Sequence, residues 1–381
     1  MKKSSHQTVS GAAVRNVAVF FGGNSSESEI SVITGMYAVN LLRGTRYRVF
    51  PVYLPPSGGF LLGEWKGVEE FAGAVKGTPV TLSGGSLVRA GRKKPCIRID
   101  VALNCCHGGM GEDGTLAALL RWNRIVSASP SAAESALFMD KTLTKIAARG
   151  LGIVAAPSLA VSERDYATAP EEVLSRIQAF GFPLVVKPAR LGSSIGLTVV
   201  RERGGLADAL ALAFELDSAA LIERYFAKKR DVNCAACRLD GQIRVSPCEE
   251  VFSGGELLSY AEKYEQGKGS CMPAELPEAV SSRIADDTRR LYEAFGMRGV
   301  VRADFLVVGE EVFFNELNTV PGSLAGYLFG DTLAQIRRFF VALLDEALLD
   351  VPREKKTLTT GILSSGIFTG AKGCKRRGNF V

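Results

Sequence analysis

The chain has 381 residues, of which 46% are hydrophobic and 23% charged, a balance ordinary for a globular enzyme. Its length predicts about two or three domains, and no run of about 18 apolar residues is present, so no membrane span is expected. The net charge of +6 is gathered largely at the two ends, and it suits an anionic ligand without requiring one.

The chain begins with a charged segment that lacks an adequate apolar run, so we expect a flexible leader over residues 1–14. The apolar run "NVAVFF" (16–21) ends at two glycines, which predicts a buried strand entering a tight loop. A helix is expected directly afterwards. Ser26 and Glu29 have the spacing of a capping box, and apolar residues recur behind them at helical spacing.

The same alternation continues further along the chain. The segment "IRIDVAL" (97–103) predicts another strand, which enters the glycine-rich loop "HGGMGEDG" (107–114) before a further helix. Alternating strands and helices are typical of an open α/β domain, which we place at residues 15–128.

A smaller α+β unit is predicted over residues 129–218. Its elements are a helical segment over about 131–149, strands at 183–188 and 197–202, and a helix near 206–216. The polar loop "ARLGSSIG" joins the two strands, and its backbone N–H groups and two hydroxyls suit an anion nest beside Lys187. Neither a GxxxxGK[ST] phosphate loop nor a GxGxxG fingerprint occurs, so any nucleotide must be held by another device.

The third predicted unit covers residues 219–353 and begins with the strand-like segment "AALIERYF". It is mostly strands, with one amphipathic helix at 279–295. The tail over residues 354–381 is rich in Gly, Ser and Thr and ends basic, so we expect partial disorder there and assign it no role.

Cys234 and Cys237 form the one Cys-x-x-Cys of the chain, in a segment that predicts strand, turn and strand. A zinc site would need a second pair or histidines at ligand spacing, and the two histidines, His6 and His107, lie far away in sequence. We therefore interpret the pair as buried strand cysteines. Free thiols indicate a reducing compartment, so a cytoplasmic location is expected.

The strongest chemical signal lies in "VRADFLVVGEEVFFNELNTVPG", where two strands flank the turn "GEE" (309–311). A three-residue loop would pair Val308 with Val312 and set the register of the hairpin. That register predicts two cross-strand pairs on one face, Asp304 with Glu316 and Arg302 with Asn318.

Two carboxylates and an amide on one face offer the hard oxygen ligands that Mg²⁺ prefers. Asp304, Glu316 and Asn318 are therefore candidate metal ligands, with Glu316 placed to bridge two ions. The alternative is an ion pair of Arg302 with one of the two carboxylates. The apolar neighbours favour the metal, because they predict a largely buried hairpin in which unpaired carboxylates are costly.

Six stretches together resemble the D-alanine–D-alanine ligases of the ATP-grasp superfamily. They are "VAVFFGGNSSESEISVITG", "HGGMGEDGTLAALL", "FMDKTLTK", "FPLVVKPARLGSSIG", "SYAEKY" and "VRADF…FNELNTVPG". They occur in the family's order and cover about residues 17–325. The resemblance implies an ATP-grasp fold with an N-terminal Rossmann-like α/β domain and the nucleotide clamped between two α+β units. It implies ATP and two Mg²⁺, with Mn²⁺ able to replace them, and a homodimer without nucleic-acid or membrane partners.

The resemblance also assigns residues. It implies nucleotide contacts by Lys141, Lys187, Ser193, Ser194, Glu223, Arg224, Tyr225, Phe226, Asp231 and Lys263, and metal ligation by Asp304, Glu316 and Asn318. It implies substrate contacts or catalytic roles for Glu27, His107, Ser193, Tyr264, Arg302, Gly322, Ser323, Leu324 and Tyr327. The implied reaction joins two D-alanines to D-alanyl-D-alanine through an acyl phosphate, for peptidoglycan precursor synthesis.

Within that reaction, the resemblance implies that Glu27 pairs with the first D-alanine's ammonium in a subsite lined by His107. Ser193 and Tyr264 would link to Glu27 when the loops at 190–196 and 253–272 close. Arg302 and the Gly322 amide would form the oxyanion hole.

Three positions depart from the family: Asp231 stands where members more often have Glu, Leu191 stands where many relatives carry an acid, and the third departure concerns the acceptor's carboxylate. Tyr327 stands where relatives place a serine that binds the acceptor's carboxylate, so either Ser323 or the Tyr327 hydroxyl is expected to take that role. The alternatives are a D-alanine–D-lactate ligase, a non-catalytic ATP-binding scaffold, and an ATP-grasp carboxylase or peptide-tagging ligase. In the lactate-making relatives the matching loop typically supplies a histidine, whereas the segment 253–272 has none, so the resemblance favours D-alanine as the acceptor.

Overall fold

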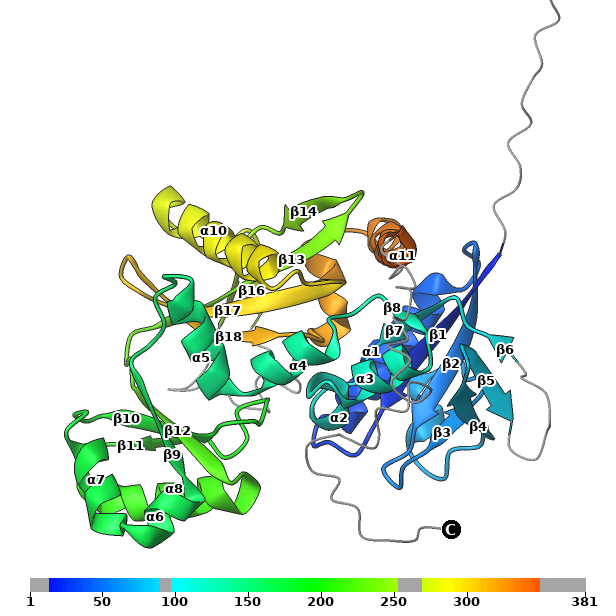
Figure 1. Cartoon of the computed structure of the whole chain (residues 1–381). Helices are drawn as coiled ribbons and strands as arrows, with labels where there is room; N and C mark the ends of the chain where they lie inside the picture. Colours follow the sequence, from blue (N-terminus) through cyan, green and yellow to red (C-terminus); the bar gives the residue numbers. More distant parts are fainter. Residues whose placement is uncertain (1–13, 90–96, 253–268, 350–381) are drawn as a thin grey trace, which may run out of the picture. The chain divides into compact units, whose positions relative to one another are not determined.

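Three sheets organise the part of the chain that the structure, a computed structural model, describes (Figure 1). The described residues are 14–89, 97–252 and 269–349. The predicted tail, Lys263, Tyr264 and most of the predicted leader lie outside them. Among the described residues, no helix is long and apolar enough to cross a membrane.

The N-terminal sheet has the order β6-β5-β4-β3-β2-β1-β7-β8. Its strands are β1 (Arg15–Gly22), β2 (Tyr47–Leu54), β3 (Phe60–Leu62), β4 (Thr78–Ser83), β5 (Ser86–Arg89), β6 (Ile97–Arg98), β7 (Val101–Asn104) and β8 (Val126–Ser127). Strands β2, β1, β7 and β8 are parallel, which confirms the α/β character, and an antiparallel extension continues from β2 through β6. Parallel strands bring their carboxyl ends to one edge, where ligands of such sheets usually bind.

The helices of this region are α1 (Ser28–Leu42), α2 (Gly109–Glu112) and α3 (Thr115–Trp122), with the short η1 (Val68–Phe71). The predicted capping box of Ser26 and Glu29 is wrong. The N-cap of α1 is Glu27, and its side chain makes no capping hydrogen bond. Glu27 therefore lies at the carboxyl edge of β1 with its carboxylate directed to other partners.

The central region folds as a four-stranded sheet of order β11-β10-β12-β9. Its strands are β9 (Ser158–Ser162), β10 (Leu184–Pro188), β11 (Thr198–Val200) and β12 (Ala219–Arg224). Its helices are α4 (Ala132–Met139), α5 (Lys141–Gly150), α6 (Glu163–Thr168), α7 (Pro170–Gln178) and α8 (Leu206–Leu216), with the short η2 (Arg203–Gly205). The single helix predicted over 131–149 is divided at Asp140, whose carboxylate accepts the Thr142 and Leu143 N–H groups and caps α5.

Strand β12 pairs with both β10 and β9 and so belongs to the central sheet. The predicted third unit begins at residue 219 and would separate β12 from these partners. The six-stranded sheet of that unit starts at Arg230 instead.

This sheet contains β13 (Arg230–Leu239), β14 (Gln242–Val245), β15 (Glu249–Val251), β16 (Ser270–Cys271), β17 (Val300–Val308) and β18 (Glu311–Asn318). Helix α10 (Glu278–Ala294) covers one face (Figure 1), followed later by η3 (Gly322–Leu328) and α11 (Leu333–Leu349), a helix that the sequence pattern did not reveal. Cys234 and Cys237 are fully buried free thiols on β13, as predicted.

The predicted three-residue turn of the β17–β18 hairpin is wrong, because Val308 pairs with Glu311 and Val307 pairs with Val312. A bulge beside Asp304 then shifts the register by one residue. The two predicted cross-strand pairs are confirmed, Asp304 with Glu316 and Arg302 with Asn318. The turn error and the bulge cancel, so the polar face forms as expected.

Candidate active site

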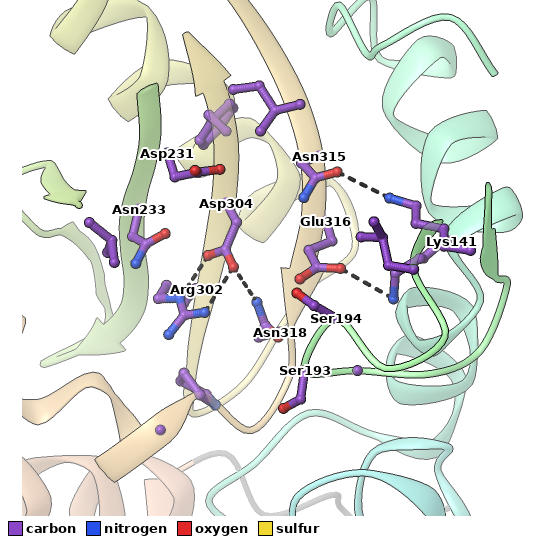
Figure 2. Close-up of a pocket in the computed structure, with 18 of the residues that line it drawn as sticks. Lys141, Ser193, Ser194, Asp231, Asn233, Arg302, Asp304, Asn315, Glu316 and Asn318 are labelled. Carbon is purple, nitrogen blue, oxygen red and sulfur yellow. Dashed lines mark hydrogen bonds and ion pairs between the residues drawn. The ribbon is translucent and has the colours of Figure 1, made fainter. Parts of the chain in front are cut away.

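A cavity of about 460 Å³ lies where the N-terminal loops, the β10–β11 loop and the polar face of β17–β18 converge. Most of the predicted site residues line it, namely Glu27, His107, Lys141, Lys187, Ser193, Ser194, Glu223, Arg224, Tyr225, Phe226, Asp231, Arg302, Asp304, Glu316, Asn318, Gly322 and Tyr327. Figure 2 shows several of them pointing toward one another from both sides of the cavity. The fold thus gathers residues from all three sheets.

Of the predicted site residues that the structure describes, two do not line the cavity. The Ser323 N–H donates to Thr34 Oγ1 at 3.3 Å, toward helix α1. Leu324 is buried in the hydrophobic core. Of the two candidates for the acceptor's carboxylate, only Tyr327 reaches the cavity.

Arg302 and Asp304 form a bidentate ion pair on β17, with N···O distances of 2.7 and 2.8 Å. Asn318 Nδ2 donates to the same carboxylate at 3.0 Å (Figure 2). Across the hairpin, Glu316 Oε2 lies 3.2 Å from Lys141 Nζ. The predicted metal ligands therefore share one face, and their negative charge is offset here by two cations from different elements.

Lys141 comes from the first turn of α5 and also donates to the Leu191 carbonyl at 2.6 Å. This contact ties α5 to the loop that follows β10. An ammonium group held between Glu316 and that loop is well placed to meet an anionic group entering the cavity.

Glu223 is 4% exposed and binds two lysines at once. Lys145 Nζ lies 2.5 Å from Glu223 Oε1, and Lys187 Nζ contacts the other carboxylate oxygen. Burial alone would raise the pKa of Glu223, but the two lysines lower it to about 2. Lys187 is also within 3.4 Å of Asn315 Oδ1, and Lys145 donates to the Asn315 carbonyl at 3.3 Å. This network joins the central sheet to β18.

The Glu27 carboxylate is enclosed at the amino end of α1. The Ser193 hydroxyl donates a hydrogen bond to Glu27 Oε1, and both side chains are buried. A Cβ added at Gly108 or at Gly192 would come within 2.9 or 2.8 Å of Glu27 Oε2. Glycine at these two positions thus lets two loops approach the carboxylate closely.

His107 is 6% exposed, and its Nε2 lies 2.8 Å from Thr34 Oγ1. The backbone N–H of His107 donates to Ser31 Oγ at 2.7 Å, which holds the loop against α1. Burial, with a smaller contribution from Arg302, lowers the pKa of His107 to about 4. The imidazole is therefore neutral at physiological pH.

Sequence reasoning missed Glu112, which also lines the cavity. Its carboxylate accepts the Gly108 N–H at 2.7 Å and the Val320 N–H at 3.2 Å, so it joins two loops from different sheets. Burial, followed by the charge of Glu27, raises the pKa of Glu112 to about 7. The acidic residue inside the glycine-rich loop "HGGMGEDG" was the available signal.

The remaining cavity-lining residues that were missed include Asn233, Glu249 and Asn315. Asn315 opposes no residue of β17, because the bulge lies between the pairs Phe305–Phe314 and Asp304–Glu316. Strict alternation along β18 would place the Asn315 side chain on the face opposite to Glu316. No sequence pattern could therefore have identified Asn315 as a cavity residue.

At the predicted nucleotide end, Asp231 is paired with Lys229. Phe226 stacks on Phe313 with ring centroids 4.9 Å apart. In the described ranges, no group of three or more His, Cys, Asp or Glu side chains is arranged to hold a metal ion. The candidate ligand set instead comprises two carboxylates and the Asn318 amide.

Comparisons with known proteins agree with this arrangement. Residues 16–127 match the family model described as the D-Ala–D-Ala ligase N-terminus, and residues 147–343 match the one described as the C-terminus. A D-alanine–D-alanine ligase of Chlorobium luteolum is 34% identical over 349 residues, covering 87% of this chain and 95% of the relative. One from Wolinella succinogenes is 33% identical over 350 residues, covering 89% and 94%.

Solved structures give the same result. The crystal structure of D-alanine–D-alanine ligase from Helicobacter pylori has a TM-score of 0.71 and 30% identity, covering 90% of this chain and 99% of that one. The VanG D-Ala:D-Ser ligase from Enterococcus faecalis has a TM-score of 0.75 and 27% identity, covering 87% and 99%. Both N-terminal and C-terminal parts of the chain are thus similar to the same group of enzymes.

Proposed function

The chain belongs to the D-alanine–D-alanine ligase family, and on that premise we propose that the cavity of Figure 2 is its active site. The protein is an ATP-dependent ligase that joins two D-alanines through an acyl phosphate and so supplies peptidoglycan precursor synthesis. The ATP-grasp fold is shared with its structural neighbours. The residue roles that follow are our proposals.

ATP is proposed to lie between the central sheet and the β17–β18 hairpin. Lys141 and Lys187 would hold its phosphates, because both ammonium groups line the cavity from opposite elements. Ser193 and Ser194 would add backbone and hydroxyl donors; both have left-handed backbone conformations, with φ of 52° and 58°. The edge of β12 from Glu223 to Phe226 would meet adenine, and Asp231 the ribose.

Two Mg²⁺, replaceable by Mn²⁺, are proposed on Asp304, Glu316 and Asn318. The donor set fits, since it offers hard oxygen atoms on one face of two directly paired strands. When bound, such ions neutralise charge on the transferring phosphoryl group. Lys141 would then exchange its contact with Glu316 for one with phosphate.

The first D-alanine is proposed to bind with its ammonium on Glu27, beside neutral His107. Support comes from the enclosure of that carboxylate by Ser193, Gly108 and Gly192. The described residues that enclose Glu27 contribute hydroxyl and backbone groups, which do not repel an ammonium as a lysine or arginine side chain would. The bound carboxylate would attack the γ-phosphate and become an acyl phosphate, with water excluded by the loop of Ser193.

Arg302 and the Gly322 N–H are proposed to stabilise the tetrahedral oxyanion when the second D-alanine attacks. Asp304 holds the Arg302 guanidinium bidentately, which orients its remaining N–H groups. Tyr264 and Lys263 keep their implied roles as predictions, because they lie outside the described residues.

The observation that carries this function is the convergence in one cavity of the Glu27–Ser193 pair, the Lys141–Glu316 pair and the Arg302–Asp304 pair. Incubation with ATP, Mg²⁺ and equal D-alanine and D-lactate at pH 7 should give mainly D-alanyl-D-alanine by mass spectrometry. ADP release should depend on D-alanine. Dominant D-alanyl-D-lactate would favour the lactate alternative, and D-alanine-independent ADP release with no ligated product would reject ligation in this cavity.

Three broader proposals accompany it. The domain division keeps the predicted boundary at about 128 and moves the second one from 218 to between β12 and β13, because β12 pairs with strands of the central sheet. A cytoplasmic location is supported by the free thiols of the described cysteines. A homodimer is proposed from the family resemblance, and sedimentation velocity measurements would test it.

A further inference from the structure

Tyr327, which is partly buried, and Glu249, which is buried, form a pair at the end of the cavity near the proposed oxyanion hole. The Tyr327 hydroxyl donates to Glu249 Oε2 at 2.9 Å, and Asn233 Nδ2 lies 3.3 Å from the same oxygen. Glu249 is 5% exposed, and both Tyr327 and Glu249 line the cavity. In the described ranges, no lysine or arginine forms an ion pair with Glu249 within 4 Å.

The backbone brings this pair close to Gly322. Between Gly322 and Tyr327, the residues Ser323, Leu324 and Ala325 all adopt left-handed conformations, with φ of 50°, 49° and 48°. Non-glycine residues rarely adopt this conformation, so the surrounding packing must hold the turn in place. The turn directs both Gly322 and Tyr327 into the same cavity.

Strand register places Glu249 in the same sheet as Arg302, two strands away. Glu249 pairs with Asn233, which pairs with Asp304, so Glu249 and Asp304 lie two strands apart, about 10 Å in a regular sheet. Although burial opposes it, the pKa of Arg302 is raised well above its usual range, chiefly by Asp304 and also by Tyr327 and Glu249. Arg302 is therefore near both members of the pair.

The direction of the hydrogen bond limits what Tyr327 can do. A hydroxyl that donates its proton to a carboxylate offers only lone pairs to its other neighbours. Tyr327 is thus poorly suited to bind the carboxylate of an incoming amino acid, the role of the serine in relatives. It is well suited to accept an N–H group.

We propose that the Tyr327–Glu249 pair accepts the proton that the second D-alanine must lose before its amine can attack. The inference rests on the proposed function, because it takes Arg302 and Gly322 as the oxyanion hole. The oxyanion hole holds the oxygen of the acyl-phosphate carbonyl, and the attacking nitrogen must approach the carbon of that carbonyl. The nitrogen is therefore expected close to the Tyr327 hydroxyl.

The proton balance is complete without another reactant. One ammonium N–H bond breaks as its proton passes to Tyr327 Oη, while the phenolic proton passes to Glu249. The free nitrogen lone pair attacks the acyl-phosphate carbon, and the C–O bond to phosphate breaks. The second proton lost by the nitrogen leaves with the phosphate, and Glu249 returns its proton to solvent when the products depart.

The charged groups that act on Tyr327, besides Glu249 itself, are Arg302 and Asp304, both on β17. Asp304 is paired with Arg302. Glu249 is therefore the carboxylate that the Tyr327 hydroxyl addresses directly.

The test compares two nucleophiles in the full-length enzyme. D-Alanine must lose a proton before attack, whereas hydroxylamine is largely unprotonated at neutral pH and captures the acyl phosphate as a hydroxamate. Tyr327→Phe should lower dipeptide formation about 10²-fold at pH 7, the lower range for general-base catalysis. The difference from wild type in the rate of dipeptide formation should become smaller as pH rises, because more of the D-alanine amine is then already deprotonated. Hydroxamate formation should stay within about threefold of wild type. Glu249→Gln should show the same pH dependence.

Tyr292→Phe is the matched control, because Tyr292 is buried on α10 and donates to the Gly299 carbonyl at 2.9 Å, outside the cavity lining. It should leave both rates unchanged. Equal losses of dipeptide and hydroxamate in Tyr327→Phe, or a dipeptide deficit that does not vary with pH, would overturn the inference. If the wild-type enzyme forms dipeptide but no hydroxamate, hydroxylamine does not capture the acyl phosphate in this cavity and the inference fails. If it forms neither product, the proposed function itself is rejected.

Discussion

The Ser193 hydroxyl donates a hydrogen bond to the Glu27 carboxylate, joining two loops that lie 166 residues apart in sequence. Glu27 is the N-cap residue of α1, yet its side chain does not cap the helix. The carboxylate is instead held at the boundary between the N-terminal sheet and the β10–β11 loop. A substrate ammonium bound there would connect closure of that loop to occupancy of the first subsite.

Glu27→Ala should weaken D-alanine binding at the first subsite much more than ATP binding. Loss of a buried charged hydrogen-bonding partner should raise the KM of the first D-alanine by about 10-fold or more. Steady-state kinetics and calorimetric ATP titration would measure the two effects. Glu29→Ala is the matched control, because Glu29 is an exposed acid in the same helical turn. Equal weakening of D-alanine and ATP would show that Glu27 acts only on helix or loop structure.

Glu316→Gln should lower kcat by about 10²-fold or more, since one well-placed electrostatic contact in an active site is worth about 3 kcal/mol. The substitution preserves shape but removes the charge that now meets Lys141. Folding should change little. Glu311→Gln, on an exposed position of the same strand, should retain wild-type turnover. Near-normal turnover of Glu316→Gln across Mg²⁺ concentrations would contradict the two-ion proposal.

Lys145→Met should destabilise the protein by about 3 kcal/mol, the lower range for breaking a buried ion pair. Lys145 is 1% exposed, and its removal leaves Glu223 with Lys187 as its remaining ion-pair partner. The KM for ATP should rise as well, because Lys187 would then be held more tightly by Glu223. Urea unfolding and ATP kinetics measure the two effects. Lys76→Met, at an exposed position, should change neither, and a Lys145 variant of wild-type stability would contradict this account.

His107 should make stability decrease as the pH falls from about 6.5 to about 4. Its folded-state pKa is lowered from 6.5 to about 4, so in this range the unfolded chain binds a proton that the folded chain does not. The loss reaches about 3 kcal/mol by pH 4, at 1.4 kcal/mol per pKa unit. His107→Gln should remove this contribution from the free energy of unfolding.

The comparison with His107→Gln is needed because Glu112 changes the free energy of unfolding in the opposite direction as the pH falls. Its pKa of about 7 in the folded state makes protonation below pH 7 favour folding. This contribution is present in both proteins, so the difference between their urea unfolding curves at pH 7 and pH 4.5 isolates His107. Parallel pH dependence of wild type and variant would show that the buried imidazole is not the cause.

Local pattern alone predicted much of this molecule. The β1–α1 unit, the strands around the Ser193 loop and the polar face of the β17–β18 hairpin follow from apolar periodicity, glycine placement and strand alternation. Alternation determines which side chains share a face whatever the chain does elsewhere. Alternation therefore grouped Arg302 with Asp304 and Glu316 with Asn318, but these residues were paired correctly across the hairpin only because the turn, assigned one residue too many, and the bulge beside Asp304 cancel.

Other features depend on contacts between segments far apart in the chain, which no local pattern encodes. Lys145 meets Glu223 and Glu112 meets Val320 only because separate sheets pack together around the cavity. The bulge that turns Asn315 toward Lys187 and the left-handed turn that brings Tyr327 to Glu249 are held by tertiary packing against unfavourable backbone conformations. The sequence by itself determined many of the elements, though not α11, and the main polar residues. Tertiary structure decided which charges are buried together, because burial and cross-sheet distance exist only in the folded chain.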